Sequence, residues 1–227
     1  MCFSAAASFT ASALLIPTGL YGCSLAISRD RCYLPLAVIP CMFGIQQGFE
    51  GMIWWATNHG QMGLANGAAL GFLGFSHCFW LLWLPLAMLF LEQRPWVRRV
   101  LMGFLGVGVL FGLSLYGPFL LLSDTFAVMV NQGSIDYQTR LLYDQFWPRA
   151  VSRLVYMLIV LGPLWLSQRV QLRVAGGFIA LALLVTYWFY NYAFASVWCF
   201  FAAVLSGYIV YFVGFATTEC GLEKDSQ

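Results

Sequence analysis

The chain has 227 residues, of which 61% are hydrophobic and only 9% are charged, and its formal net charge is +2. Soluble domains carry roughly 25% charged residues, so this composition is typical of a membrane protein and excludes an ordinary soluble domain. The basic residues form short clusters without a long run of like charge, which argues against a nucleic-acid partner. The composition instead predicts the lipid bilayer as the main partner.

Seven apolar stretches are long enough to cross a bilayer. A hydrocarbon core of roughly 30 Å needs about 20 apolar residues per helix, because lipid offers no hydrogen-bond partner to an exposed backbone. The expected spans are residues 5–28, 33–56, 67–91, 100–122, 150–168, 172–194 and 195–216. The sequence therefore predicts an all-α fold, in which a bundle of about seven transmembrane helices forms a single domain over residues 1–227. The first stretch lacks the basic start of a signal peptide and is interpreted as a span.

The distribution of basic residues predicts the orientation of this bundle. Eight of the eleven lie in connections on one side, namely Arg29, Arg31, Arg94, Arg98, Arg99, Arg169, Arg173 and Lys224. The other three, Arg140, Arg149 and Arg153, lie on the opposite side. Basic residues favour the cytoplasmic side, so we expect the N-terminus outside and the C-terminus inside. The expected location is a cell membrane crossed several times, most simply the bacterial inner membrane.

The one long connection, at about residues 123–149, is then extracytoplasmic. Its acidic and basic residues are accompanied by four aromatic side chains, Tyr137, Tyr143, Phe146 and Trp147. A plain solvated linker would contain fewer aromatic residues, so we expect this loop to lie on the outer face as an interfacial cap. The alternative is an ordered loop whose aromatic rings only mark the depth of the lipid headgroups.

Glu50 is the only acidic residue placed well inside an expected span. The spacing of Gln46, Gln47 and Trp54 allows all three to share its helical face. Burial of an ionised carboxylate is costly unless the charge has a partner, so Glu50 is a candidate catalytic or proton-exchanging residue. The alternative is a protonated or glutamine-bonded Glu50 that only fixes helix packing.

His77 is the only histidine inside an expected span, and Trp80 follows one turn later. Counted along their helices from the outer ends, both Glu50 and His77 fall in the outer half of the membrane. At that depth, His77 is a candidate partner for Glu50 in acid–base chemistry. The alternative is a histidine that packs among aromatic side chains.

Further groups gather at the same outer side. Arg149 and Arg153 begin the fifth span at positions i and i+4, where a helix N-terminus and two guanidinium groups favour an anion. Tyr187, Asn191 and Trp198 lie near the outer ends of the last two spans, and a buried amide such as Asn191 needs hydrogen-bond partners. The alternatives are arginines that reach the headgroup phosphates and an ordinary interfacial aromatic belt.

The chain opens with Met1 and Cys2. Removal of Met1 would leave the Cys2 thiol beside a free α-amine, which can act as its base, so Cys2 is a candidate nucleophile or metal chelator. The seven cysteines contain no CxxC pair and most lie in apolar runs, so the sequence predicts neither a metal site nor a disulfide framework. The alternative is that the N-terminal segment only begins the first span.

Three segments carry a resemblance to a known family: Met1-Cys-Phe-Ser-Ala5, Phe43-Gly-Ile-Gln-Gln-x-x-Glu50-Gly51 and Ser196-Val-Trp-Cys-Phe-Phe-Ala-Ala203. Over its whole length the chain resembles a family of uncharacterised bacterial multi-pass membrane proteins, described as a domain of unknown function. The resemblance implies a membrane protein and assigns no catalytic role.

Three better-known classes of membrane protein fit the sequence poorly. A retinal protein needs a lysine in a span, and the only lysine is Lys224 in the tail. Zinc hydrolases and haem proteins with two histidine ligands need more suitably placed histidines than His59 and His77 provide. The sequence therefore points to no particular cofactor.

The leading hypothesis is a protein that binds or transports a small ligand in an outward-facing cavity of polar and aromatic side chains. Glu50 would exchange protons or meet a cation there, and Trp54, Trp80 and Tyr187 would offer ring faces to a cationic or amphiphilic ligand. The first alternative is a membrane-embedded enzyme that uses Glu50 and His77 as acid and base. The second is a structural or assembly subunit without a site. Convergence of these side chains in one cavity would distinguish the hypotheses.

Overall fold

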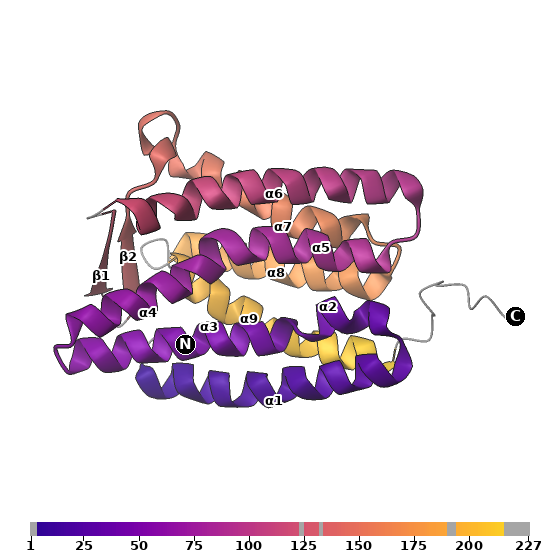
Figure 1. The fold of residues 1–227 in the computed structure, drawn as a ribbon, viewed down its shortest axis with the longest axis horizontal. Helices are drawn as coiled ribbons and strands as arrows, with labels where there is room; N and C mark the ends of the chain where they lie inside the picture. The colour runs from indigo at the N-terminus through magenta and orange to yellow at the C-terminus, as the bar shows by residue number, and fades with distance from the viewer. Residues whose placement is uncertain (1–3, 123–124, 132–133, 190–193, 216–227) are drawn as a thin grey trace, which may run out of the picture.

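The computed structural model describes residues 4–122, 125–131, 134–189 and 194–215, and its helices run roughly along one long axis (Figure 1). In chain order the helical elements are α1 Ala5–Arg29, η1 Arg31–Tyr33, α2 Leu34–Ala37, α3 Ile39–Asn58, α4 Met62–Gly74, η2 Phe75–Phe79, α5 Trp80–Leu91, α6 Pro95–Leu121, η3 Leu142–Gln145, α7 Arg149–Leu166, α8 Val170–Phe189 and α9 Phe194–Phe215. The fold is therefore predominantly helical, as the sequence predicted.

Six of the helical segments are long and apolar enough to cross a membrane. They are Ala5–Arg29, Arg31–Asn58, Met62–Leu91, Pro95–Leu121, Arg149–Leu166 and Val170–Phe189. The chain thus has the helices of a multi-pass membrane protein. Within α9, the apolar segment Phe201–Phe215 is shorter than the other six. The third segment begins at Met62, five residues before the expected start, because the apolar and small residues of α4 continue the helix toward the preceding turn.

A β-hairpin replaces the loop expected between the fourth and fifth spans. Strand β1, Phe126–Asn131, pairs antiparallel with β2, Ser134–Thr139, so that Val128 lies opposite Tyr137. Ile135, Tyr137 and Thr139 alternate on the buried face of β2, which is the period-two pattern of a strand. The Tyr137 ring stacks on Phe72 of α4 at a centroid distance of 4.9 Å. This packing holds the hairpin against the helices.

We call the two ends of the bundle the hairpin end and the opposite end. The hairpin end holds β1 and β2, and the opposite end holds the connections from α1 to α2, from α5 to α6 and from α7 to α8 (Figure 1). Helices α3, α6 and α8 finish at the hairpin end, whereas α7 and α9 begin there. Side chains from the start of α7 and of α9 can therefore meet those from the middle of the α4–α5 segment.

Small residues bring α1 and α3 into close contact. A Cβ added at Gly19 would lie 2.3 Å from the backbone nitrogen of Cys41, and one at Gly44 would lie 2.7 Å from the Ile16 side chain. In lipid, where no hydrophobic force drives helices together, such close approach supplies van der Waals contact along the whole interface. This packing fixes the direction in which α3 points its polar face.

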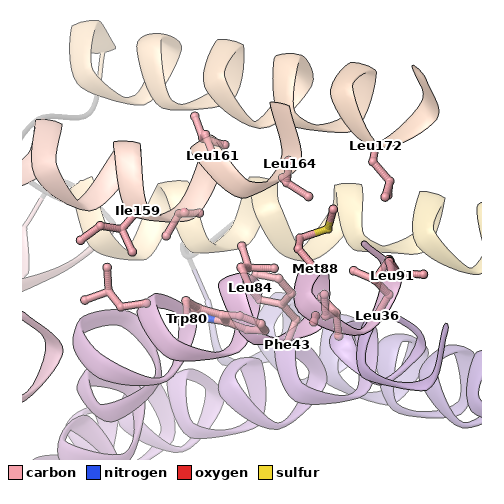
Figure 2. Packing of buried hydrophobic residues seen from close by; sticks show 14 of the residues in the cluster. Leu36, Phe43, Trp80, Leu84, Met88, Leu91, Ile159, Leu161, Leu164 and Leu172 are labelled. Carbon is pink, nitrogen blue, oxygen red and sulfur yellow. The ribbon is translucent and has the colours of Figure 1, made fainter. Parts of the chain in front are cut away.

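The main hydrophobic core lies between α2, α3 and α5 on one side and α7, α8 and α9 on the other (Figure 2). Trp80 of α5 stacks on Phe43 of α3 at a centroid distance of 4.0 Å. Met88 and Leu84 of α5 pack in the same cluster as Leu164 of α7 (Figure 2). The core therefore joins the first and last helices of the chain into one body.

The cysteines differ in one respect from the sequence-based expectation. Cys32, in η1, is disulfide-bonded, although the cysteine spacing predicted no disulfide framework. Spacing along the chain does not reveal which cysteines approach each other in space, and that distance decides whether a disulfide forms. Cys23, Cys41, Cys78 and Cys199 carry free thiols.

At the opposite end, arginines bind the exposed carbonyls of helix C-termini. Arg94 forms a bidentate pair with Glu92, with both contacts at 2.8 Å, and donates to the Leu166 carbonyl of α7 at 2.6 Å. Arg98 donates to the Leu89 carbonyl of α5 at 2.7 Å. The hydrogen bonds from Arg94 hold the pKa of the Glu92 carboxyl below its ordinary value. These contacts satisfy carbonyls that a helix leaves without partners.

Candidate functional site

A cavity of about 150 Å³ lies at the hairpin end of the bundle, and we call it the arginine cavity. Its charged and hydroxyl-bearing walls include Ser76, His77, Asp136, Tyr137, Thr139, Arg149, Ser152, Arg153 and Tyr156. These residues come from η2, β2 and α7, with Trp198 and Cys199 added from α9. Segments distant in sequence thus contribute polar groups to one cavity.

The π-helical segment η2 places two of these residues. Phe75–Phe79 interrupts the run of α4 and α5 with one wider turn, which shifts the faces of the helix on either side. The Ser76 hydroxyl lies 2.9 Å from His77 Nδ1 and contacts the Leu73 carbonyl at 3.4 Å. The His77 ring meets Phe119 edge to face at a centroid distance of 5.5 Å. His77 is therefore held by a hydroxyl on one side and an aromatic ring on another.

Arg149 joins the hairpin to the start of α7. Its guanidinium makes a bidentate contact with Asp144 of η3, at 2.9 and 2.8 Å, and it also donates to the Thr139 carbonyl at the end of β2. The hydrogen bonds from Arg149 lower the pKa of the Asp144 carboxyl. Arg149 thus fixes the wall of the cavity while contributing positive charge to it.

Arg153 lies one helical turn further along α7 than Arg149, on the same face of the helix. Its guanidinium carbon is 5.9 Å from the centroid of the Tyr187 ring of α8, a cation–π distance. Beside it, the Ser152 hydroxyl accepts a hydrogen bond from Trp147 Nε1 at 2.9 Å. The two arginines predicted to form a pair therefore do line one cavity, and Tyr187 lies against the deeper one.

The balance of charge in the cavity is positive. Among the described residues that line it, Asp136 is the one carboxylate beside the two arginines. Burial raises the pKa of Asp136, although its hydrogen bond to Gln138 and the charge of Arg149 act in the other direction. A carboxyl with a raised pKa carries its negative charge less readily. The lining therefore carries two guanidinium groups and one carboxyl group, while Asp144 pairs with Arg149 from outside the lining.

A wider space of about 380 Å³ lies against the hairpin, next to the arginine cavity. The two spaces share Asp136, Tyr137, Thr139 and Arg149 as lining residues. These four residues therefore lie where the two spaces adjoin.

The polar face of α3 lies behind the cavity, away from its lining. Gln46, Gln47 and Glu50 are all fully buried, with 0% exposure. Gln46 Oε1 accepts a hydrogen bond from Trp80 Nε1 at 2.8 Å. Cys199, which lines the cavity, lies close enough to Gln46 and Glu50 to interact with both. Cys199 thus both lines the cavity and lies close to the polar face of α3.

The structure does not bring Glu50 and His77 into one cavity. His77 lines the arginine cavity, whereas Glu50 does not. Counting residues along the two helices predicted how far each side chain lies from the end of the bundle. The direction in which each side chain points depends instead on the rotation of its helix about its own axis. Helix α3 packs against α1 and α9, whereas η2 packs against α6.

Several buried polar atoms on and near α3 have no hydrogen-bond partner. Among the described residues, these atoms include both amide atoms of Gln47, Nε2 of Gln46, Trp54 Nε1, Thr57 Oγ1 and Ser8 Oγ. Trp54, another predicted ligand residue, is 6% exposed and does not line the arginine cavity. Trp80 is also buried, and it faces the core instead of the cavity. Cys2 and Asn191 lie outside the described residues.

Sequence reasoning missed Ser76, Asp136, Ser152, Tyr156 and Cys199 as lining residues. One signal was available for two of them. Ser152 and Tyr156 follow Arg149 at positions i+3 and i+7, so they share its face of α7. The position of Asp136 depended on the hairpin, which was not predicted.

These features define a helical protein with helices suited to crossing a membrane several times and with a polar cavity at its hairpin end. The model of a family of unknown function, DUF6629, matches residues 1–220, and the chain belongs to this family. This match confirms the resemblance to a family of unknown function. No curated protein and no solved structure matches the chain.

Proposed function

We propose that the protein binds or transports a small anionic ligand in the arginine cavity. This proposal rests on the presence of Arg149 and Arg153 in one cavity. Among the lining residues that the structure describes, Asp136 is the one carboxylate. The sequence-based hypothesis favoured a cation at Glu50. The anion is the better choice because Glu50 does not line the cavity and the two arginines do.

The chemistry of the walls suits a carboxylate. Guanidinium groups offer forked donors that match two carboxylate oxygens, and the hydroxyls of Ser76 and Ser152 add further polar contacts. Both arginines lie in the first turns of α7, where the helix dipole also favours negative charge. In another protein, a cavity of about 150 Å³ takes up benzene, so a ligand of that size with one carboxylate fits here.

The proposed orientation places this cavity on the outer side of a bacterial inner membrane. The eight basic residues on one side against three on the other support it, and α9 would be the seventh span. The disulfide of Cys32 at the opposite end argues the other way, because disulfides are rare in a reducing cytoplasm. In the proposed orientation, a reporter that is active only in the cytoplasm, fused after Gln227, should be active. A signal from a periplasm-active reporter at the same position would reverse the orientation.

The proposed function is tested with three probes of one size and different charge: benzoate, benzyl alcohol and benzylamine. Each is equilibrated by dialysis against the full-length protein in lipid nanodiscs, and empty nanodiscs correct for partition into lipid. Benzoate should bind, with saturation, more tightly than either of the others. Equal binding of the three probes, or preference for benzylamine, would overturn the proposal.

Arg153→Gln tests whether the binding occurs in this cavity. Loss of a charged hydrogen-bonding partner should weaken benzoate binding roughly tenfold or more. Arg173→Gln is the matched control, because Arg173 is exposed on α8 and does not line the cavity. Benzoate affinity that is the same in both variants would place the bound anion elsewhere.

A further inference from the structure

A second space extends the arginine cavity into the apolar core, and we call it the apolar chamber. It has a volume of about 70 Å³ and lies among α2, α3, α5, α7, α8 and α9. Its walls include Leu36, Ile39, Phe43, Leu84, Val160 and Leu164. Of the described residues that line it, none is charged.

The two spaces meet at three residues. Tyr156, Trp198 and Cys199 line both the arginine cavity and the apolar chamber. Tyr156 lies on the same face of α7 as Arg149 and Arg153, one turn deeper than Arg153. Going inward along this face, the lining therefore changes from guanidinium groups to an aromatic ring and then to aliphatic side chains.

We propose that the ligand is an amphiphilic anion: a carboxylate on a single unbranched acyl chain. The carboxylate lies at Arg149 and Arg153, and the chain passes Tyr156 and Trp198 into the apolar chamber. This inference rests on the proposed function, and it adds the chemical class of the ligand. An anion that was polar throughout would leave the apolar chamber empty.

The volumes limit the length of the chain. The chamber of about 70 Å³ has room for a few methylene groups beyond the head region, and two long acyl chains do not fit. A short- or medium-chain acid therefore matches the space better than a phospholipid. Each methylene that enters the chamber should strengthen binding from water about fourfold, until the chamber is full.

The chamber also reaches the lipid-facing side of the bundle. Phe178 of α8 lines it and is itself 54% exposed. On α9, Ala202 and Ile209 line the same chamber. An acyl chain dissolved in the bilayer can therefore approach the chamber beside α8 while its carboxylate stays near headgroup depth, where the arginines begin α7.

The test compares butanoate, hexanoate and octanoate, by dialysis against the full-length protein in phosphatidylcholine nanodiscs, with empty nanodiscs subtracted. Affinity is referred to the free acid in water. We expect it to rise with chain length, and we expect 1-octanol and octylamine to bind more weakly than octanoate. Arg153→Gln should weaken all three acids together.

Ala202→Phe fills the chamber and leaves the arginines in place. It should abolish the gain from butanoate to octanoate, a loss of tenfold or more in octanoate affinity, while butanoate and benzoate bind as before. Their unchanged binding also shows that the variant is folded. Val204→Phe is the matched control, since Val204 lies two residues later on α9 and is 58% exposed on the outside of the bundle.

The outcomes separate the two proposals. If benzoate binds through Arg153 but affinity does not depend on chain length or on Ala202→Phe, the acyl-chain ligand is wrong and the anion site stands. If Ala202→Phe and Val204→Phe weaken octanoate equally, the chain does not occupy the chamber. If no acid binds above the level of empty nanodiscs, the proposed function fails as well.

Discussion

Arginines at the two ends of the bundle have different surroundings. At the opposite end, Arg94 and Arg98 donate to carbonyls at the ends of α7 and α5, and Arg169 lies over the Tyr33 ring at 5.0 Å and donates to its hydroxyl. At the hairpin end, Arg149 and Arg153 line a cavity. The arginines at the opposite end hold helices together, whereas Arg149 and Arg153 combine such contacts, with Asp144 and with the Tyr187 ring, with a place in the lining of a cavity.

Buried polar atoms also differ between the two ends of the bundle. Those without a hydrogen-bond partner lie from the middle of the bundle to the hairpin end, on residues such as Gln47, Trp54, Thr57 and Ser134. At the opposite end, every buried side-chain nitrogen or oxygen of the described residues has a partner. Leaving such atoms unpaired costs stability, so the hairpin half should be the less stable half of the bundle.

The largest effect on stability is expected from Arg94→Met. This variant leaves the Glu92 carboxylate, which is 7% exposed, without its guanidinium and removes the bond to the Leu166 carbonyl. The melting temperature should fall by roughly 8 °C, measured by thermal unfolding in detergent. Arg99→Met is the matched control on the exposed face of α6 and should change it little. Equal effects of the two variants would mean that the opposite end is not held by this contact.

A smaller loss of stability is expected from Gln46→Leu, in the middle of the bundle. Leucine has a similar volume but accepts no hydrogen bond, so Trp80 Nε1, now bonded to Gln46 at 2.8 Å, would be buried without a partner. The free energy of unfolding should fall by about 1–3 kcal/mol. Trp80→Phe removes the donor, and comparing it with the double variant isolates the hydrogen bond. A wild-type stability for Gln46→Leu would show that this bond contributes nothing.

The sequence was sufficient to predict a mainly helical multi-pass membrane protein, because an apolar stretch of 20 residues has few alternatives to a membrane helix, and six helices are long and apolar enough to cross a membrane. It was not sufficient to predict the hairpin. The buried residues Val128, Ile135 and Tyr137 belong to strands in which buried and exposed positions alternate over only a few residues. The aromatic residues of the same segment are equally typical of an interfacial loop. For the site, the pairing of Arg149 and Arg153 followed from helical spacing alone.

The separation of Glu50 from His77 did not follow from the sequence. Helical spacing relates residues on one helix, whereas the relation between two helices depends on their rotation about their axes. Close glycine contacts such as that of Gly44 with Ile16 set the rotation of α3, and these become visible only once the helices are paired. The lining role of Cys199 has the same origin, since it depends on how α9 faces α3 and α7.

Asp136→Asn should raise the stability of the protein slightly, whereas Arg94→Met and Gln46→Leu should lower it. Because burial raises the pKa of Asp136, the folded protein takes up a proton there more readily than the unfolded chain, and the charged carboxyl lowers stability above that pKa. Asparagine removes the charge, so the melting temperature at pH 7 should rise by roughly 1–2 °C. At pH 4 the difference should shrink, because Asp136 is then protonated in a larger share of the folded molecules. A lower melting temperature at pH 7 would mean that its attraction to Arg149 outweighs burial.

The smallest effect is expected from Gln47→Leu, and it distinguishes most sharply between structure and function on α3. Gln47 is 0% exposed, like its neighbour Gln46, yet neither of its amide atoms has a hydrogen-bond partner. Replacing an unpaired amide by an apolar side chain of similar volume removes a desolvation cost and leaves no other group unpaired. Stability should therefore stay close to that of the wild type, in contrast to Gln46→Leu at the adjacent position. A loss as large as that of Gln46→Leu would show that Gln47 bonds to ordered water within the bundle, and the polar face of α3 would then have to be counted among the elements that hold the fold together.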